Sequence, residues 1–149
     1  MEELLKYQGN LLKNFQSSWY RYLFKDLQVQ ERLLGIKGLR GVGKTTLLLQ
    51  HLKQIIEQGE KGLYVTAEHP YFYNQTLFEL ASLWYSYGGK VLLVDEIHKY
   101  PDWSRELKLI YDGFPELRVI FTSSSALDLY RGEADLSRRL ETQILHGLS

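Results

Sequence analysis

The chain has 149 residues, of which 44% are hydrophobic and 24% are charged. This balance is typical of a globular domain with a sizeable core and argues against a disordered chain. Basic and acidic side chains number 18 each, so the formal net charge is zero and no global field attracts nucleic acid or an anionic membrane. The absence of cysteine excludes disulfides, thiolate metal sites and cysteine nucleophiles.

The N-terminus "MEELLKYQGN" lacks the charged and then apolar layout of a signal peptide. No apolar run approaches the roughly 18 residues that a membrane-spanning helix needs. We therefore expect a cytoplasmic protein with no membrane partner.

The hydrophobic pattern predicts helices that alternate with strands. Residues 2–25 are expected to form one or two amphipathic helices, the first ending near Gly9-Asn10, within an N-terminal segment (1–30) that packs on the core (31–149). Later helices are expected from Lys44 to Gly59, from an Asn74 N-cap to about Tyr87, after Asp102, and at 126–129. Strands are expected at 31–38, 62–67, 90–94, 118–122 and 142–148. This alternation indicates an α/β fold, a single domain with a parallel sheet of about five strands and helices on both faces.

Residues 38–45 read "GLRGVGKT", which matches the phosphate-loop pattern G-x-x-x-x-G-K-[ST] between a predicted strand and a predicted helix. Glycines let several backbone N–H groups point at one anion, and the helix that follows adds the positive end of its dipole. Lys44 would reach the β- and γ-phosphates, and the Thr45 hydroxyl would bind Mg²⁺. We expect Arg40 to face the acidic site or solvent rather than phosphate. The residues expected to bind the nucleotide are Gly38, Leu39, Arg40, Gly41, Val42, Gly43, Lys44, Thr45 and Thr46.

Two carboxylates follow the apolar run "VLLV" at 91–94. The carboxyl end of a buried parallel strand opens on the crevice that also contains the phosphate loop. Asp95 is therefore a candidate for holding Mg²⁺, and Glu96 is a candidate general base that accepts a proton from the attacking water. A strand that ends in solvated acids is the alternative interpretation.

Four stretches, "GIKGLRGVGKTTLLLQ", "VLLVDEIHKYPDW", "VIFTSSSALDL" and "DLSRRLETQILHGLS", resemble a group of bacterial and archaeal AAA-type P-loop ATPases. The resemblance covers residues 20–149. It implies ATP and Mg²⁺ as ligands, and no guanine-reading N-K-x-D sequence is present. The adjacent Asp95-Glu96 pair resembles that of P-loop ATPases in which an inserted strand separates the loop strand from the Asp strand, which implies a sheet of order 5-1-4-3-2. Members of this group usually continue into a lid and a C-terminal domain of unknown function, so we expect the chain to end before those parts.

The resemblance also implies further catalytic residues. A polar residue at the tip of the inserted strand, Ser123 or Thr122 among the three hydroxyls at 122–124, would sense the γ-phosphate or orient water, although hydroxyls after a strand also form turns. Arg139 matches the position of an arginine that neutralises transition-state charge. Two solvated arginines at a helix end, Arg138 and Arg139, are the alternative.

The remaining aromatic and histidine residues point to no separate site. The aromatic stretch at 69–87 carries no interleaved lysine or arginine, which favours core packing or a protein-binding surface over nucleic acid. Tyr20 or Tyr22 could stack on the adenine or pack in the core. The four histidines lack the spacing of a metal cage, and His98 is expected to have a surface or supporting role.

The leading interpretation is an Mg²⁺-dependent ATPase domain that couples hydrolysis to a conformational change or to binding of a protein partner or another copy of the chain. The alternatives are a nucleotide-gated protein-binding module with little hydrolysis of its own and, with less support, a small-molecule kinase.

Overall fold

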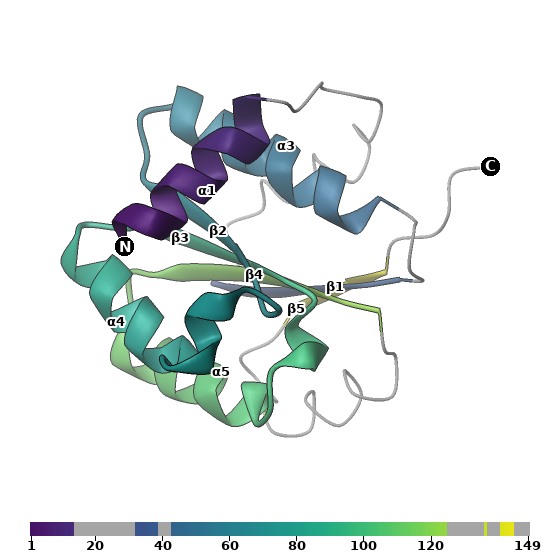
Figure 1. Cartoon of the computed structure of the whole chain (residues 1–149). Helices are drawn as coiled ribbons and strands as arrows, with labels where there is room; N and C mark the ends of the chain where they lie inside the picture. Colours follow the sequence, from purple (N-terminus) through teal and green to yellow (C-terminus); the bar gives the residue numbers. More distant parts are fainter. Residues whose placement is uncertain (14–31, 39–42, 125–135, 137–140, 145–149) are drawn as a thin grey trace.

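The computed structural model describes residues 1–13, 32–38, 43–124 and 136, and the backbone of residues 141–144. Its centre is a five-stranded sheet in which every pair of neighbouring strands is parallel, in the order β2-β3-β4-β1-β5 (Figure 1). The strands are β1 (Leu33–Lys37), β2 (Gly62–Thr66), β3 (Val91–Asp95), β4 (Arg118–Ser123) and β5 (Glu141–Ile144). The predicted order 5-1-4-3-2 is therefore confirmed, and so is the α/β fold class.

Helices cover both faces of the sheet, which makes three layers. Helices α1 and α3 lie on one side, and α4 and α5 lie on the other (Figure 1). The helical elements are α1 (Glu2–Lys13), α3 (Lys44–Glu57), η1 (Pro70–Tyr73), α4 (Leu77–Ser86), η2 (Ile97–Lys99) and α5 (Trp103–Gly113).

Each face of the sheet has its own hydrophobic core, because successive strand residues point to opposite faces. In β3, Leu92 and Val94 pack with α4 and α5, while Val91 and Leu93 pack with α3. All five β3 residues are buried, as an apolar strand covered on both sides requires.

Two local predictions are wrong. Helix α1 continues through Gly9 and Asn10, because burial of Leu4 and Gln8 on the same helix outweighs the roughly 1 kcal/mol helix penalty of glycine. Asn74 does not cap α4: it ends the 3₁₀ turn η1 that begins at Pro70, and α4 starts three residues later. The α4 N-cap is Thr76, whose hydroxyl accepts a 3.0 Å hydrogen bond from the backbone N–H of Glu79.

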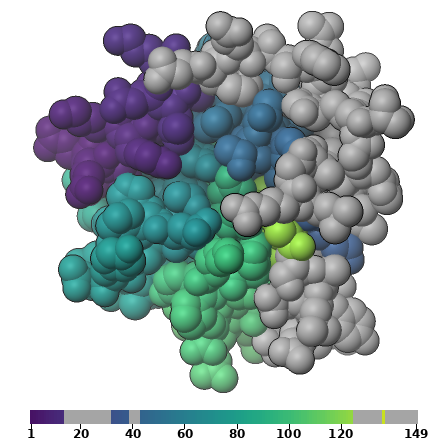
Figure 2. Space-filling view, turned by 45° about the vertical axis from the view of Figure 1, so that its right-hand side comes forward, coloured from purple at the N-terminus to yellow at the C-terminus, as the bar shows by residue number. Residues whose placement is uncertain are grey.

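Helix α1 lies against the outer edge of β2. The Gln8 side chain is 5% exposed; its amide nitrogen donates to the Gly62 carbonyl at 3.1 Å, and its amide oxygen accepts from the Tyr64 N–H at 2.7 Å. One side-chain amide therefore pairs with two backbone groups that a further strand would otherwise pair with. Figure 2 shows α1, in purple, on the surface beside the blue residues of α3.

Some predictions lie outside the described residues: the helix at 126–129, the end of the last strand beyond Ile144, and the boundary near residue 30. No helix in the described ranges is long and apolar enough to cross a membrane.

Candidate functional site

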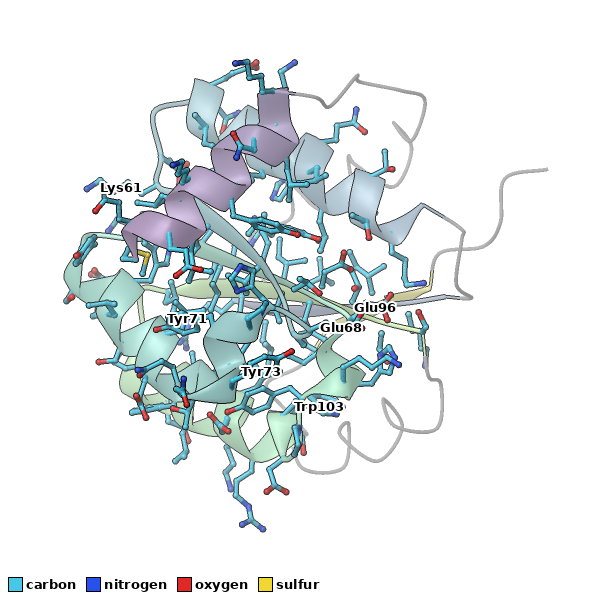
Figure 3. All side chains as sticks on the ribbon, in the orientation of Figure 1. Lys61, Glu68, Tyr71, Tyr73, Glu96 and Trp103 are labelled. Atoms are coloured by element: carbon cyan, nitrogen blue, oxygen red, sulfur yellow. The ribbon has the colours of Figure 1, made fainter. Side chains whose placement is uncertain are left out.

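The carboxyl ends of β2 and β3 and the start of α3 surround a cavity of about 720 Å³. This size is typical of small-molecule sites, which span about 300–1,000 Å³. Figure 3 shows Glu68 and Glu96 at this end of the sheet and Lys61 at the opposite end. The cavity is lined by Tyr7, Gly43, Lys44, Thr45, Thr46, Tyr64, Thr66, Glu68, Asp95, Glu96, His98, Lys99 and Ser124.

The two described ends of the predicted phosphate loop are linked directly. Gly38 follows β1, and Gly43 precedes α3 in the left-handed region at φ 89°, a conformation that favours glycine. The Lys44 ammonium donates to the Gly38 carbonyl at 2.9 Å. Residues 39–42, which include the predicted Leu39, Arg40, Gly41 and Val42, lie outside the described residues.

Lys44 is 4% exposed, and this burial lowers the pKa of its ammonium. The negative charges of Glu96 and Asp95 act in the opposite direction and raise it. A cation that is partly stripped of water gains more from an anion than one in solvent, since water competes less for its charge.

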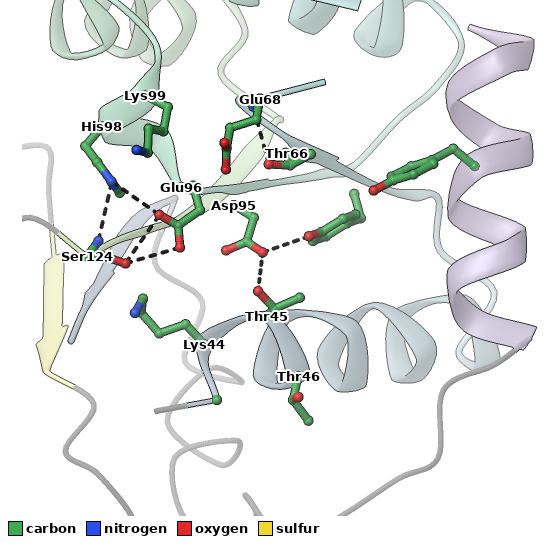
Figure 4. A pocket seen from close by; sticks show the side chains of 13 residues that line it. Lys44, Thr45, Thr46, Thr66, Glu68, Asp95, Glu96, His98, Lys99 and Ser124 are labelled. Atoms are coloured by element: carbon green, nitrogen blue, oxygen red, sulfur yellow. Dashed lines mark hydrogen bonds and ion pairs between the residues drawn. The ribbon is translucent and has the colours of Figure 1, made fainter. Parts of the chain in front are cut away.

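Asp95 is 2% exposed and accepts hydrogen bonds from three hydroxyls; Figure 4 shows the one from Thr45. Its Oδ2 accepts from Thr45 at 2.5 Å and from Tyr64 at 2.7 Å, and its Oδ1 accepts from Thr122 at 2.5 Å. Thr45 and Asp95 thus bring a hydroxyl and a carboxylate oxygen together at the start of α3. Oxygen donors of this kind are the ligands that Mg²⁺ prefers in proteins.

Tyr64 was not predicted as a site residue. Burial and the nearby Asp95 carboxylate raise the pKa of its hydroxyl far above the usual range, so the group remains a neutral donor at physiological pH. In the sequence it is one residue of an apolar strand, and the pattern does not distinguish it from a core tyrosine.

Glu96 leaves the strand in the left-handed region, at φ 56°, and its backbone N–H donates to the Thr122 hydroxyl at 2.9 Å. The Ser124 hydroxyl lies 3.1 and 3.3 Å from the two carboxylate oxygens of Glu96. The His98 Nε2 lies 3.3 Å from Glu96 Oε2. Figure 4 shows this cluster opposite the side chain of Lys44.

The three predicted hydroxyls have three different environments. Thr122 and Ser123 are fully buried, whereas Ser124 lines the cavity. Thr122 bonds to Asp95, and the Ser123 hydroxyl lies 3.3 Å from the His98 Nδ1. Of these hydroxyls, Ser124 therefore has direct access to a ligand in the cavity.

The structure thus brings most of the described candidate residues together, and Thr46 also lines the cavity. Arg139, Tyr20 and Tyr22 lie outside the described residues. Four further residues besides Tyr64 line the cavity without having been predicted: Tyr7 on α1, Thr66 at the end of β2, Glu68 after it, and Lys99 in η2. Within the described ranges, no three histidine, aspartate or glutamate side chains form a metal cage.

Comparison with solved structures gives the same fold in AMPPCP-bound DnaA from Aquifex aeolicus, with a TM-score of 0.58, 18% identity, and coverage of 88% of this chain and 49% of that chain. The replication initiator DnaA bound to AMPPCP and single-stranded DNA has a TM-score of 0.56, 19% identity, and coverage of 88% and 48%. The chain spans about half the length of these proteins, and at this identity the likeness shows the fold alone. Comparison with curated protein sequences gives no match.

A sequence model of the family AAA_14, described as an AAA domain, matches residues 30–149. That match covers most of the chain and includes the phosphate-loop residues, the Asp95-Glu96 pair and the hydroxyls at 122–124, at the end of β4. The chain therefore belongs to the AAA domain family, whose members are generally ATPases.

Proposed function

We propose that this domain binds ATP with Mg²⁺ in the cavity between α3 and the carboxyl ends of the strands, and hydrolyses it. The observation that carries the proposal is the arrangement of Lys44 and Thr45, at the start of α3, around the same cavity as Asp95 and Glu96, at the end of β3. A cation and a helix N-terminus on one wall suit the phosphates, and two carboxylates on the other suit a metal and a base.

The polyphosphate contacts come from the start of α3 and the loop before it. We assign the Lys44 ammonium to the β- and γ-phosphates, because it is buried beside the loop and its charge is poorly compensated by water. The backbone of Gly38, Leu39, Arg40, Gly41, Val42 and Gly43, with the first turn of α3 through Thr46, is proposed to surround the phosphates.

The residues present also fit a magnesium ion. The hydroxyl of Thr45 and the carboxylate of Asp95 would hold it, and Tyr64 and Thr122 fix the carboxylate by donating to it. Bound Mg²⁺ would neutralise charge on the phosphate oxygens. One carboxylate and one hydroxyl suit Mg²⁺, since this ion keeps several waters and takes other ligands from the substrate phosphates.

Glu96 is the proposed general base. Its carboxylate would accept a proton from a water molecule whose oxygen attacks the γ-phosphorus. A new P–O bond forms while the bond to the β–γ bridging oxygen breaks, and the products are ADP and inorganic phosphate.

Ser124 lies beside the Glu96 carboxylate and is the hydroxyl best placed to contact the water or the γ-phosphate. Thr122 would support Asp95 and Glu96 from within the sheet, and Ser123 would support Glu96 through His98. Arg139 remains the candidate for neutralising transition-state charge.

Binding is tested by measuring ATP affinity with Mg²⁺ by calorimetry. Loss of one charge-assisted contact costs about 1.5–3 kcal/mol, so Lys44→Ala is expected to weaken ATP binding about 10- to 100-fold. Lys53→Ala is the matched control, because Lys53 is exposed on the same helix and should leave affinity unchanged. Equal affinity in wild type and Lys44→Ala would contradict the site assignment.

Hydrolysis is tested by phosphate release. Glu96→Gln is expected to retain ATP affinity and to lower kcat about 10²- to 10⁴-fold, the usual contribution of a positioned base. Glu57→Gln, at an exposed position, is the control. A wild-type chain that binds ATP tightly but releases no phosphate would favour the nucleotide-gated binding module instead.

A further inference from the structure

His98 lies between the end of β4 and the carboxylate of Glu96. It belongs to η2, which begins directly after Glu96, and its side chain is 12% exposed. The ring nitrogen Nε2 lies 3.3 Å from Glu96 Oε2, while Nδ1 lies 3.4 Å from the backbone nitrogen of Ser124 and 3.3 Å from the Ser123 hydroxyl. One imidazole therefore connects the Glu96 carboxylate to the end of the neighbouring strand.

These contacts specify how a neutral ring carries its proton. The backbone N–H of Ser124 can only donate, so the Nδ1 that faces it must accept. The proton of the neutral imidazole is then on Nε2, which faces the Glu96 carboxylate. The Ser123 hydroxyl can rotate and is compatible with this assignment.

We propose that His98 is a positioning residue that holds the carboxylate of Glu96 in its reactive orientation; this inference rests on the proposed hydrolytic function. The Nε2–H donates to Oε2, and the Ser124 hydroxyl donates to Oε1 at 3.1 Å and lies 3.3 Å from Oε2. Two donors from different segments of the chain restrict rotation of a side chain with three torsion angles. Such restriction matters for the rate, because a displacement of about 1 Å in a catalytic group can cost about 10²-fold.

The two contacts of the ring can be separated by substitution. In His98→Gln, an amide nitrogen occupies the approximate position of Nε2 and can donate to Glu96, but the acceptor for Ser124 N–H is lost. In His98→Asn, an amide oxygen occupies the approximate position of Nδ1 and can accept from Ser124, but no atom reaches Glu96. The pair therefore distinguishes positioning of the base from support of the backbone.

The kinetic test measures kcat and ATP affinity for both variants and for His98→Ala. We expect Asn and Ala to lower kcat about tenfold or more, Gln to remain within about threefold of wild type, and all three to bind ATP with unchanged affinity. The opposite order, with Asn active and Gln impaired, would overturn the inference, since it would assign the effect to the Ser124 contact. Thermal unfolding of each variant identifies any loss of kcat that comes from misfolding.

A second measurement does not depend on turnover. Long-range ¹H–¹⁵N correlation spectra of the wild-type chain without nucleotide report the histidine tautomer, with His98→Gln identifying the His98 signals. We expect protonation at Nε2 and a shift of those signals in Glu96→Gln. Protonation at Nδ1, or signals that Glu96→Gln leaves unchanged, would overturn the inference. If the wild type binds ATP without hydrolysing it, hydrolysis fails as a function while these spectra still decide whether His98 holds Glu96.

Discussion

Replacing Gln8 with leucine tests whether α1 completes the sheet at the edge of β2. Leucine keeps the approximate size and the helix propensity of glutamine, so the change removes the amide with little effect on α1 itself. The Gly62 carbonyl and the Tyr64 N–H then lose the bonds of 3.1 and 2.7 Å that Gln8 provides. Each unsatisfied buried group costs about 1–3 kcal/mol, so we expect the free energy of unfolding to fall by about 2–6 kcal/mol.

Urea denaturation followed by circular dichroism measures this change, and thermal melting gives a second reading. For a chain of this length each 1 kcal/mol corresponds to about 2–4 °C, so Tm should fall by at least about 4 °C. Lys6→Ala is the control on the same helix, because Lys6 is exposed and should change stability by less than about 0.5 kcal/mol. A comparably small effect for Gln8→Leu would show that water, rather than Gln8, satisfies the β2 edge.

Three further predictions concern stability. Burial and the positive charge of Arg118 lower the pKa of His51 to about 4, from 6.5 in the unfolded chain. Below pH 6.5 the unfolded state therefore binds more protons than the folded state, and the free energy of unfolding should fall by about 3 kcal/mol as pH drops from 6.5 to 4. His51→Gln should flatten this slope in denaturation measured across pH. Gly89→Ala places a methyl group 2.3 Å from the Trp84 ring and should cost about 1–3 kcal/mol or more, whereas Gly9→Ala, with open space around it, should stabilise; equal effects on Tm would contradict this. Thr76→Ala removes the N-cap of α4 and should cost about 1 kcal/mol in urea denaturation, and no change would mean that water replaces the cap.

The positions of β1 to β4 could be predicted because each is an apolar run between helical patterns. Parallel strands open at their carboxyl ends on one crevice, so residues that follow different strands meet there. This rule brings Asp95 and Glu96 to the start of α3, although the start of α3 lies about fifty residues before them in the chain. The order of the strands could not be predicted from hydrophobic patterning, which identifies strands but not their neighbours in the sheet. The predicted order depended instead on the resemblance of the Asp-Glu pair to that of P-loop ATPases.

The contacts missed in the sequence depend on where individual side chains point. Tyr64 has the pattern of a core residue, and only its position on β2 beside β3 directs its hydroxyl to Asp95. Gln8 has the pattern of a polar residue on an amphipathic helix, and its role depends on how α1 is placed against β2. Tertiary placement of this kind has no local signal in the sequence.

The orientation of Glu96 explains how two consecutive carboxylates serve one cavity. In a continuing strand Asp95 and Glu96 would point to opposite faces of the sheet, so one of them would be directed away from the phosphate loop. The left-handed backbone at Glu96, φ 56°, ends this alternation, and both side chains line the cavity. For a residue other than glycine this conformation costs about 1–2 kcal/mol. The bond from its N–H to the Thr122 hydroxyl and the contacts of its carboxylate with Ser124 and His98 offset that cost. Asp95 keeps the regular strand geometry and is enclosed by hydroxyls, which agrees with its proposed role as a metal ligand, while Glu96 turns out of the strand to where a water molecule can reach it.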